Sequence, residues 1–494
     1  YSGKHDWLAD AASTRAMSAH GKKAMTGDVT VPEGVIDLTE AWNNPENVRD
    51  NRFILKQGFV YYVPAGKTFE HNLDVSAGNG QGGNMTATIY VAGKMIVPGG
   101  HNGTADFDIT VLKDGELYWD WNNTNNGNLY IGNGGAARIE CYGKIGTTNN
   151  GQTTTDINNV TLKGGSYLNL YKGGMEKFVV NGKFLCEQNN SKVGELYSDI
   201  PVEINYQSQN DYDYAFTSNS ASYVFNSTFE CAGNMLIESH SELYFNGCAN
   251  IAGTIKMNGE SDLYVNKYLN AGKIYCDQGR IHLYKALLDA GMIQIPFGGG
   301  NAYIESAATS AGNSKKKTLS SDNLSEIECG TFMIKYINNN IVNYKNNGNL
   351  EKTDALRGNI VIKCDQFQGG DQYNPVNVNT EDVQVLLNES VAINPDPTTY
   401  SFEKPNCDEE VPPTPDPVYY DLIVKVVDGQ EGWGTVKTTE YDIPEGEFRT
   451  FSATPNEGYE FVKWTDGDTN AERTVKMDSD KEFTAIFKEK ENNT

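Results

Sequence analysis

The chain has 494 residues, a formal net charge of −25, a hydrophobic content of 38% and a mean hydropathy of −0.53. A surface this acidic repels the phosphates of nucleic acids, which excludes DNA and RNA as expected partners. No run of 18 apolar residues occurs, so we expect contact with a membrane only through an anchor outside this sequence.

The first 50 residues are expected to be irregular, apart from one short helix near residues 38–44. Strand signals begin at Phe53–Leu55 and Phe59–Val63, where large apolar residues precede the turn residues Pro64–Lys67. A parallel β-helix otherwise leaves unpaired strand edges at its open end. We therefore predict a parallel β-helix over residues 51–405, beginning with an N-terminal cap.

A loose repeat follows this cap. Residues 89–95 (Ile-Tyr-Val-Ala-Gly-Lys-Met) recur as residues 139–145 and again as residues 178–184. The copies lie 50 or 39 residues apart, which is about two coils of a solenoid. Tracts rich in Asn and Gly between them are predicted to be loops.

Between Tyr223 and Ile304 the repeat becomes regular, with a period of 20 residues. One column contains Tyr223, Leu243, Leu263, Leu283 and Tyr303, and the next contains Val224, Tyr244, Tyr264, Tyr284 and Ile304. An Ala-Gly pair also recurs, at residues 232–233, 252–253, 271–272, 290–291 and 311–312. Units this short, rich in Gly, Asn and Tyr, indicate single turns of a β-solenoid. Because successive strand residues point to opposite faces, the Leu column is predicted inside and the Tyr column outside.

The pattern weakens after Gly312, although strand signals return at residues 332–335, 359–363 and 382–387. Residues 406–417 are rich in Pro and acidic side chains, which favours an extended, semi-rigid linker. Residues 418–490 then form a separate β-rich unit. The sequence thus predicts an all-β protein, a parallel β-solenoid followed by a small β-rich C-terminal domain.

The C-terminal unit carries the core Gly458-Tyr459-Glu460-Phe461-Val462-Lys463-Trp464, the turn Met477–Lys481 and the closing strand Ala485–Phe487. In this order the elements resemble the divergent internalin-type B-repeat, also called the Listeria–Bacteroides repeat. The resemblance implies a non-enzymatic spacer or adhesion module of secreted and surface-attached bacterial proteins, in which Tyr459 and Trp464 are core residues. In coil period and composition, the first 400 residues are similar to right-handed parallel β-helix proteins of Bacteroides-type cell surfaces. Together the two resemblances imply an extracellular or outer cell-surface location, as for a surface lipoprotein.

Eight cysteines occur, and no pair has the Cys-x-x-Cys spacing of a zinc site or a redox motif. Several, such as Cys141 and Cys276, occupy positions where an inward-facing strand residue belongs. Most are interpreted as small buried apolar residues, with a minority bridged. No metal site and no cofactor are predicted.

An enzyme has to be considered, because the β-helix fold also hosts polysaccharide lyases and galacturonan hydrolases. The Asn-Thr-Asp, Asp-Asp, Gly-His-Gly and Arg-Ile-Lys motifs of galacturonan hydrolases are absent from the sequence. One polar cluster is predicted on adjacent coils, namely His240, Glu242, Glu260, Asp262, Asp277, Arg280 and His282. It is either a catalytic patch or a set of solvated side chains beside the Leu and Tyr columns.

The most distinctive candidate for ligand binding is the column of Tyr244, Tyr264 and Tyr284. Facing outward, these rings would form a flat strip that stacks on sugar rings or contacts a host glycoprotein. Alternatively, they form a ladder that only stabilises the solenoid. We expect a secreted or surface-anchored adhesion or scaffolding protein that binds a glycan and is not an enzyme; the alternative is a polysaccharide-active β-helix enzyme.

Overall fold

The computed structural model describes residues 31–32, 34–75, 85–101, 105–132, 135–187, 193–296, 302–306, 324–334, 356–357, 360–370, 375–378, 385–387, 391–393, 402–407, 419–437, 439–444 and 448–490. The protein is nearly all β, and the chain divides into two compact units, residues 1–411 and residues 412–494. The predicted fold class is confirmed: long parallel sheets form a β-solenoid, and a small β domain follows.

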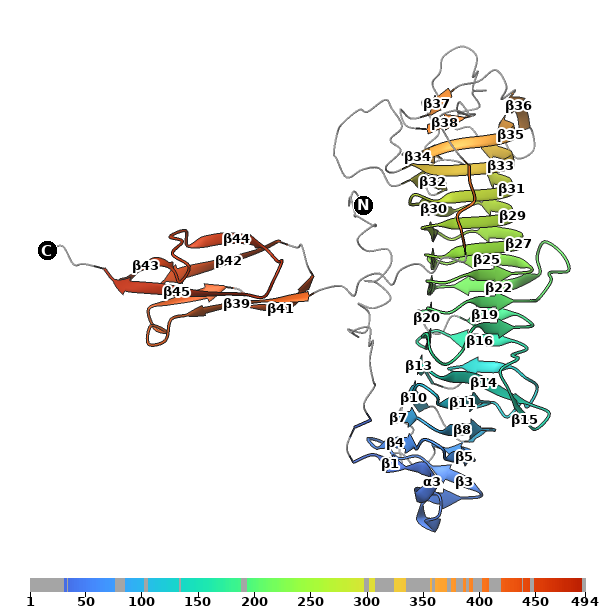
Figure 1. The fold of residues 1–494 in the computed structure, drawn as a ribbon, viewed down its shortest axis with the longest axis horizontal. Helices are drawn as coiled ribbons and strands as arrows, with labels where there is room; N and C mark the ends of the chain where they lie inside the picture. Colours follow the sequence, from blue (N-terminus) through green and yellow to red (C-terminus); the bar gives the residue numbers. More distant parts are fainter. Residues whose placement is uncertain are drawn as a thin grey trace. The chain divides into compact units, whose positions relative to one another are not determined.

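Among the described residues, the longest sheet with one continuous strand order has 13 strands, and all its neighbouring pairs are parallel. In spatial order its strands are β1 (Ile36–Asp37), β4 (Val60–Val63), β7 (Met85–Val91), β10 (Ala105–Val111), β13 (Ala137–Cys141), β17 (Tyr167–Leu170), β20 (Gly194–Ser198), β23 (Ala221–Phe225), β26 (Glu242–Phe245), β28 (Ser261–Val265), β30 (Gly279–Leu283), β32 (Tyr303–Ser306) and β34 (Leu356–Arg357). Spatial order follows chain order, so each coil lies on the one before it (Figure 1).

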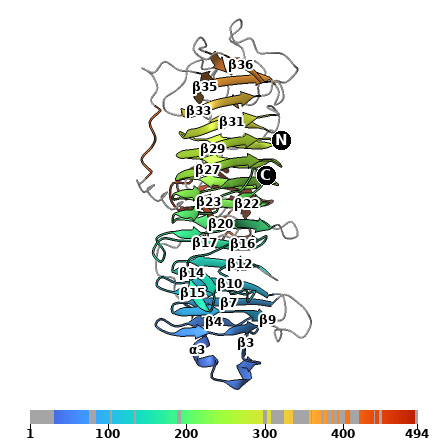
Figure 2. The same ribbon diagram turned by 90° about the vertical axis from the view of Figure 1, so that its right-hand side faces the viewer.

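A second sheet, of 16 strands, forms another wall of the solenoid. Its main path is β12 (Leu129–Ile131), β16 (Val160–Lys163), β19 (Phe184–Glu187), β22 (Tyr214–Asn219), β25 (Asn234–Glu238), β27 (Cys248–Met257), β29 (Tyr268–Cys276), β31 (Leu287–Ile295), β33 (Ser325–Ile334), β35 (Ile360–Gly370), β38 (Val391–Ile393) and β37 (Val385–Leu387). Off this path lie β18 (Phe178–Val180), β21 (Val202–Ile204), β24 (Phe229–Cys231) and β36 (Pro375–Val378). Figure 2 shows β27, β29, β31, β33 and β35 stacked one above another.

Two shorter sheets complete the walls near the N-terminal end. One consists of β5 (Thr68–Glu70), β8 (Lys94–Val97), β11 (Glu116–Trp119), β14 (Lys144–Asn149) and β15 (Gln152–Thr154). The other consists of β2 (Val48–Arg49), β3 (Arg52–Ile54), β6 (Asn72–Asp74) and β9 (Gly100–His101).

Residues 34–50 are more regular than the sequence predicts, whereas residues 1–30 lie outside the described residues. Residues 1–50 were expected to be irregular, yet β1 already pairs with β4 in the 13-stranded sheet. The expected helix is α3 (Leu38–Ala41), whose first turn is capped by the Asp37 carboxylate, and it is followed by the 3-10 turn η1 (Pro45–Asn47). Leu38 is fully buried in the solenoid core, so this helix covers the end of the core.

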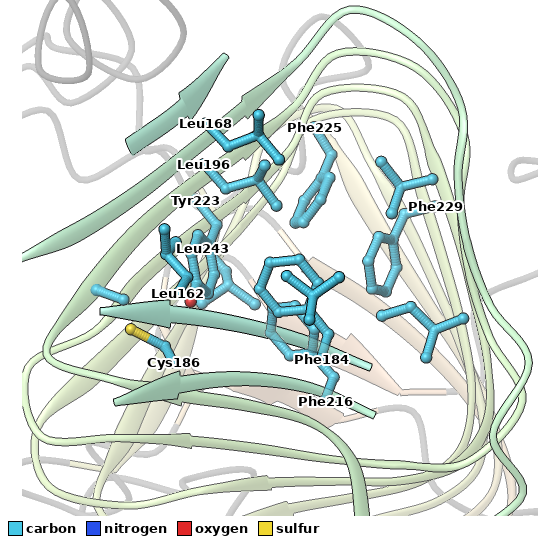
Figure 3. Close-up of a cluster of buried hydrophobic side chains, with 14 of the residues drawn as sticks. Leu162, Leu168, Phe184, Cys186, Leu196, Phe216, Tyr223, Phe225, Phe229 and Leu243 are labelled. Carbon is cyan, nitrogen blue, oxygen red and sulfur yellow. The ribbon is translucent and has the colours of Figure 1, made fainter. Parts of the chain in front are cut away.

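One apolar core runs through the solenoid from Leu38 to Phe367. The coils enclose it, with Leu196, Tyr223 and Leu243 contributed by the 13-stranded sheet and Phe184 and Phe216 by the 16-stranded sheet (Figure 3). The rings of Phe184 and Phe216 stack with their centroids 5.4 Å apart. Stacking of like on like arises because parallel, in-register coils place equivalent residues about 4.8 Å apart.

The predicted columns are correct for their first three members and wrong thereafter. Tyr223, Leu243 and Leu263 are register partners, as are Val224, Tyr244 and Tyr264. Leu263 then pairs with Ile281 instead of Leu283, because the next coil is two residues shorter. Ile304, which was placed in the outer column, pairs with Ile281 in the inner one, and Tyr303 pairs with Arg280.

The predicted equivalence of the three copies of the looser N-terminal repeat is correct for two of them. Ile89 pairs with Ile109, which pairs with Ile139, so these copies lie two coils apart as predicted. The third copy begins at Phe178, which belongs to β18 in the other large sheet. Its similarity reflects the common pattern of a buried strand before a turn.

The Ala-Gly pair at residues 252–253 marks a bulge in the 16-stranded sheet, where the register between β27 and β29 shifts. A Cβ atom on Gly272 would lie 2.6 Å from the carbonyl oxygen of Ala252 on the preceding coil, so only glycine fits there. Gly291 meets the same constraint against Gly272. The next glycine of this column is Gly330, and the predicted pair at residues 311–312 lies outside the described residues.

The C-terminal unit contains two small sheets. One is ordered β41 (Glu440–Pro444), β39 (Tyr419–Val426), β45 (Lys481–Glu489) and β43 (Tyr459–Trp464), and the other is ordered β40 (Gly434–Lys437), β42 (Phe448–Pro455) and β44 (Glu472–Lys476). Trp464 is fully buried among Phe451, Phe461 and Phe483, and its indole N–H donates to the carbonyl of Asn470 at 2.7 Å. Tyr459 is half-buried and stacks on Trp433. The unit therefore has an apolar core of its own.

Replacement of Leu263 by Asp should destabilise the solenoid by about 3–5 kcal/mol, because a carboxylate would lie unpaired in the apolar core. Leu263 is fully buried there. Chemical unfolding followed by circular dichroism measures the effect. The matched control is Gln294→Asp, at a partly exposed strand position, which should change little. Equal stability of the Leu263→Asp variant and the wild type would contradict the inward assignment.

Residues 419–494 expressed alone should fold, because the core around Trp464 draws only on residues of this unit. We expect a cooperative thermal transition monitored by tryptophan fluorescence. Trp464→Ala should abolish this transition, since truncation of a buried Trp costs about 3–5 kcal/mol, a large share of the stability of a small domain. An unfolded isolated unit would show that it depends on the solenoid.

Candidate functional site on the outer face of the 13-stranded sheet

A ladder of stacked rings lies on the outer face of β26, β28 and β30. Tyr244 and Tyr264 stack with centroids 4.3 Å apart and planes 4° from parallel. His282 stacks on Tyr264 at 4.5 Å and 13°. The three side chains occupy one register column, which continues to Glu305. The column is closely covered, since Tyr244, Tyr264 and His282 are only 4%, 8% and 5% exposed.

The ring geometry corrects the predicted aromatic strip. Tyr264 has Tyr244 against one face and His282 against the other, so neither face is available to stack on a sugar. The prediction that Tyr244, Tyr264 and Tyr284 form one exposed column is therefore wrong. Contact of these residues with a ligand stays a prediction, and it would have to use ring edges and hydroxyl groups.

Tyr284 lies at a corner of the coil, outside the ladder. Its backbone N–H donates to the carbonyl of Val265, as that of Asn266 does to the carbonyl of Phe245 one coil earlier. Tyr284 thus follows a ladder of asparagines, in which the amide of Asn246 donates to the side-chain oxygen of Asn226 at 2.7 Å and that of Asn266 to Asn246. The ring of Tyr284 is half-buried, with the ammonium of Lys285 5.8 Å from its centroid.

A second column beside the rings carries charge. Glu242, Asp262 and Arg280 are successive register partners. Arg280 donates to both oxygens of Asp262, at 2.6 Å from Nε and 2.5 Å from Nη2. Nε2 of His282 lies 2.8 Å from Oδ1 of Asp262, and Nδ1 lies 2.7 Å from Oε1 of Glu305. The structure thus brings three members of the predicted polar cluster together and adds Glu305.

For His282 and Asp262, the hydrogen bonds and ion pairs outweigh the effect of burial on the pKa. Burial alone would lower the pKa of His282, but hydrogen bonds to Asp262 and Glu305 raise it above its ordinary value. Burial alone would raise the pKa of Asp262, but hydrogen bonds from His282 and Arg280 lower it. Burial also raises the pKa of Tyr244 and of Tyr264, so both hydroxyl groups stay protonated.

This arrangement suits structural stabilisation better than proton transfer. Both nitrogens of His282 face carboxylates, so a protonated ring donates twice and keeps no lone pair for a substrate proton. Asp262 has each oxygen engaged by Arg280, and one of them by His282 as well. A general base or nucleophile needs one such group to be available.

Two other members of the predicted cluster lie beside this centre, since Glu242 is the register partner of Asp262 and the backbone carbonyl of Glu260 accepts a hydrogen bond from Arg280 at 3.3 Å. Glu242 accepts a hydrogen bond from the hydroxyl of Tyr244 at 3.2 Å. His240 and Glu260 form a long, exposed pair at 3.8 Å. Asp277 follows β29 in the other large sheet, where burial raises its pKa. Among the described residues, no three His, Cys, Asp or Glu side chains are arranged to hold a metal ion.

A second ring ladder, which the sequence reasoning missed, lies nearer the N-terminal end. Tyr142 stacks on Tyr171 with centroids 4.4 Å apart, and Tyr171 is tilted against Tyr197 at 5.7 Å. The hydroxyl of Tyr171 donates to the buried carboxylate of Glu140 at 2.7 Å. The signal available in the sequence was Tyr142 directly after Cys141 at the end of a repeat copy, but unequal coil lengths hid its partners.

The cysteines follow the predicted division. Six remain as buried thiols, namely Cys141, Cys186, Cys231, Cys276, Cys329 and Cys364. Burial raises the pKa of Cys141 and of Cys276 to about 12, which makes these thiols poor nucleophiles. Cys248 and Cys407 form a disulfide across 159 residues of sequence, a pairing that the sequence alone did not identify.

A shallow polar groove of about 320 Å³ lies beside the Ala-Gly bulge, lined by residues 207–211, 232–234 and 252–253. Asp213 holds this loop in place, because Oδ2 accepts from the Tyr206 hydroxyl and the Gln209 backbone N–H, each at 2.8 Å. A hydrogen bond from Lys183 helps lower the pKa of Asp213 to about 2. Tyr212 projects from the same loop with 80% of its surface exposed.

The C-terminal unit matches a known family model. Residues 423–491 match the divergent InlB B-repeat domain, which supports the predicted B-repeat module. Domains of this type are typical of bacterial surface or extracellular proteins. No curated protein and no solved structure matches the chain. No helix in the described ranges is long and apolar enough to cross a membrane.

Stability conferred by His282 should fall as pH rises. Its pKa is higher in the folded protein, so its contribution is complete below the unfolded value of about 6.5 and disappears as pH passes the folded value. The wild type should therefore exceed His282→Gln in melting temperature by more at pH 5.5 than at pH 9. Both pH values lie above the range in which Asp262, with its lowered pKa, becomes protonated.

The control for this comparison is His240→Gln, because the His240 side chain is 75% exposed. Its melting temperature should follow that of the wild type at both pH values. If the difference in melting temperature between the wild type and His282→Gln grows toward alkaline pH, the proposal that His282 stabilises the ladder in its charged form is refuted.

Proposed function

We propose that the protein is a secreted or surface-anchored bacterial adhesion or scaffolding protein without enzymatic activity. The observation that carries this proposal is a parallel β-solenoid followed in the same chain by a B-repeat domain. A solenoid with one continuous core is a long, rigid support on which residues recur at fixed spacing. The B-repeat then serves as the spacer or adhesion module.

The disulfide supports an extracellular location. Cys248 and Cys407 are bridged, and such bridges persist in oxidising compartments, whereas the bacterial cytosol keeps thiols reduced. The finer assignment, to a right-handed β-helix lipoprotein of a Bacteroides-type cell surface, is part of this proposal. It draws on the coil architecture, the B-repeat match and the bridge together.

The absence of catalysis is proposed from the state of the polar cluster. Asp262, Arg280, His282 and Glu305 satisfy one another, and ring stacking covers His282. A polysaccharide lyase or glycoside hydrolase needs carboxylates or a base directed at a bound sugar. The cluster offers no such arrangement, so the enzyme is the less supported candidate.

For a glycan ligand, the groove beside Tyr212 is better suited than the ring ladder. Tyr212 is 80% exposed, and the ammonium of Lys256 lies 5.5 Å from its ring centroid. The loop before it exposes the side chains of Gln207, Gln209 and Asn210. The Gln209 amide nitrogen donates to the Gln207 carbonyl at 3.2 Å. Oδ1 of Asn210 accepts from the backbone N–H of Tyr212 at 2.9 Å, which leaves the Gln209 side-chain oxygen and the Asn210 amide nitrogen available on exposed side chains. An exposed ring beside amide groups on a fixed loop provides stacking and hydrogen bonds for a hydroxylated ligand.

Binding to a glycan array, run beside lyase and hydrolase assays on acidic polysaccharides, tests this proposal. We expect glycan binding without release of sugar. Tyr212→Ala should weaken binding about 5- to 30-fold, corresponding to about 1–2 kcal/mol for a contact residue, and leave the melting temperature unchanged. Tyr244→Ala should lower the melting temperature and leave glycan binding unchanged, since Tyr244 is buried in the ladder.

Three results would count against parts of the proposal. Release of unsaturated sugars would replace it with a lyase. Glycan binding that needs Tyr244, Tyr264 and Tyr284 but not Tyr212 would show that these three tyrosines, and not the groove, form the binding site. A protein that binds no glycan at all would leave only the scaffolding role.

A further inference from the structure

Residues 402–407 form a strap across the outside of the solenoid. In sequence they follow β38, but in space they run back across the 16-stranded sheet from the level of β35 toward β27 (Figures 1 and 2). The strap ends at Cys407, which is bridged to Cys248, the first residue of β27. Beyond the strap the chain continues into the C-terminal unit.

The strap packs against an apolar strip on the outer surface of the coils beneath it. Cys248, Tyr268 and Leu287 are register partners on the outer side of β27, β29 and β31, and they are 2%, 4% and 4% exposed. Phe402 and Cys407 pack against these three residues. Three apolar positions that would otherwise face solvent are therefore covered by the strap.

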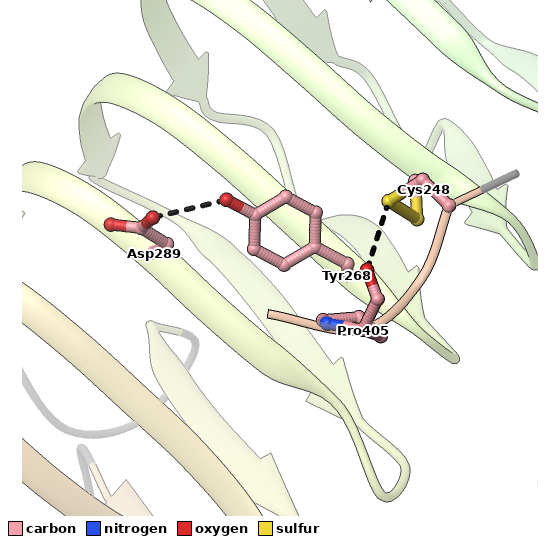
Figure 4. The surroundings of a disulfide bond; sticks show 5 residues. Cys248, Tyr268, Asp289 and Pro405 are labelled. Atoms are coloured by element: carbon pink, nitrogen blue, oxygen red, sulfur yellow. Dashed lines mark hydrogen bonds between the residues drawn. A yellow bond between two sulfur atoms is a disulfide. The ribbon is translucent and has the colours of Figure 1, made fainter. Parts of the chain in front are cut away.

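Polar contacts fix its position along the rod. Lys404 pairs with Asp289 at 3.0 Å. The hydroxyl of Tyr268 donates to the same carboxylate at 3.0 Å, as Figure 4 shows. The ammonium of Lys363, on β35, lies 5.5 Å from the ring centroid of Phe402. The strap thus contacts at least four coils, those of β27, β29, β31 and β35.

The covalent bond is the contact able to withstand a sustained pull. The Lys404 side chain is 63% exposed, and an exposed ion pair contributes little and exchanges readily. The apolar contact of Phe402 is small. The disulfide, in contrast, joins residues 159 apart in sequence and can be opened only by chemistry.

We propose that the strap is a force bypass. Tension that reaches the solenoid from the C-terminal unit enters at Cys248 through the disulfide. The residues between Cys248 and Cys407, which include β28 to β38, then carry no load and remain folded while the rest of the chain is pulled. This role rests on the proposed function, since only a tethered rod is pulled from its C-terminal side.

Single-molecule force spectroscopy on the full chain tests this inference. The protein, purified under oxidising conditions, is held by its two ends and stretched until it unfolds. The untreated protein should release about 55 nm less contour length than the same protein after phosphine reduction. That is the length of the 159-residue loop at about 3.5 Å per residue.

Two variants separate the bridge from the surrounding contacts. Cys407→Ser should give the longer extension without reductant. Lys404→Ala, which removes the ion pair but keeps the bridge, should retain the shorter one. If Cys407→Ser does not fold, reduction of the wild type on the instrument provides the same comparison.

A full-length extension of the untreated protein would overturn the proposal, as would a free Cys407 thiol in a peptide map. Unfolding of β28–β38 at the same force in oxidised and reduced protein would also overturn it. These experiments need neither a glycan nor a cell surface. A failure here is therefore distinguishable from a failure of the proposed adhesion function.

Discussion

The structure depends on in-register stacking of parallel coils. Each side chain has its equivalents about 4.8 Å above and below it. The residue type at a position is therefore constrained by the residues stacked on it as much as by its neighbours in its own coil. Inside, this rule produces the continuous apolar core that contains Leu263. Outside, it produces runs of one interaction type, such as the asparagine ladder from Asn226 to Asn266 and the stacked rings of Tyr244, Tyr264 and His282.

The same rule explains why two charged groups, Asp262 and His282, can be buried on the outer face of a sheet. Close stacking excludes water from the column of His282, which by itself disfavours every charged group. Neighbouring coils supply Asp262 on one side and Glu305 on the other, and Arg280 completes the set. The cluster is stable because each charge meets its partner across one coil step, and this satisfaction leaves little chemistry available to a substrate.

The sequence could predict the fold wherever coils keep the same length. The period of 20 residues identified the columns at Tyr223, Leu243 and Leu263 correctly. It failed at Ile281, where the coil is two residues shorter, and Tyr284 was placed in a column that His282 occupies. The sequence also could not predict that the outer rings are buried. Alternation of residues along a strand distinguishes the inner face from the outer face, but it does not show how closely the side chains of an outer column stack. The pairing of Cys248 with Cys407 joins distant segments, and no local pattern encodes it.

Unequal coils have a consequence for how such a chain can diverge. The step from Leu263 to Ile281 is 18 residues and that from Ile109 to Ile139 is 30, yet both coils deliver their residues to the same sheet. Insertions and deletions at the corners therefore leave every column intact. Related chains can drift in length and in corner sequence until alignment no longer detects them, while their architecture persists. Kinship among such proteins is better sought in the order of their columns than in their residue-by-residue identity.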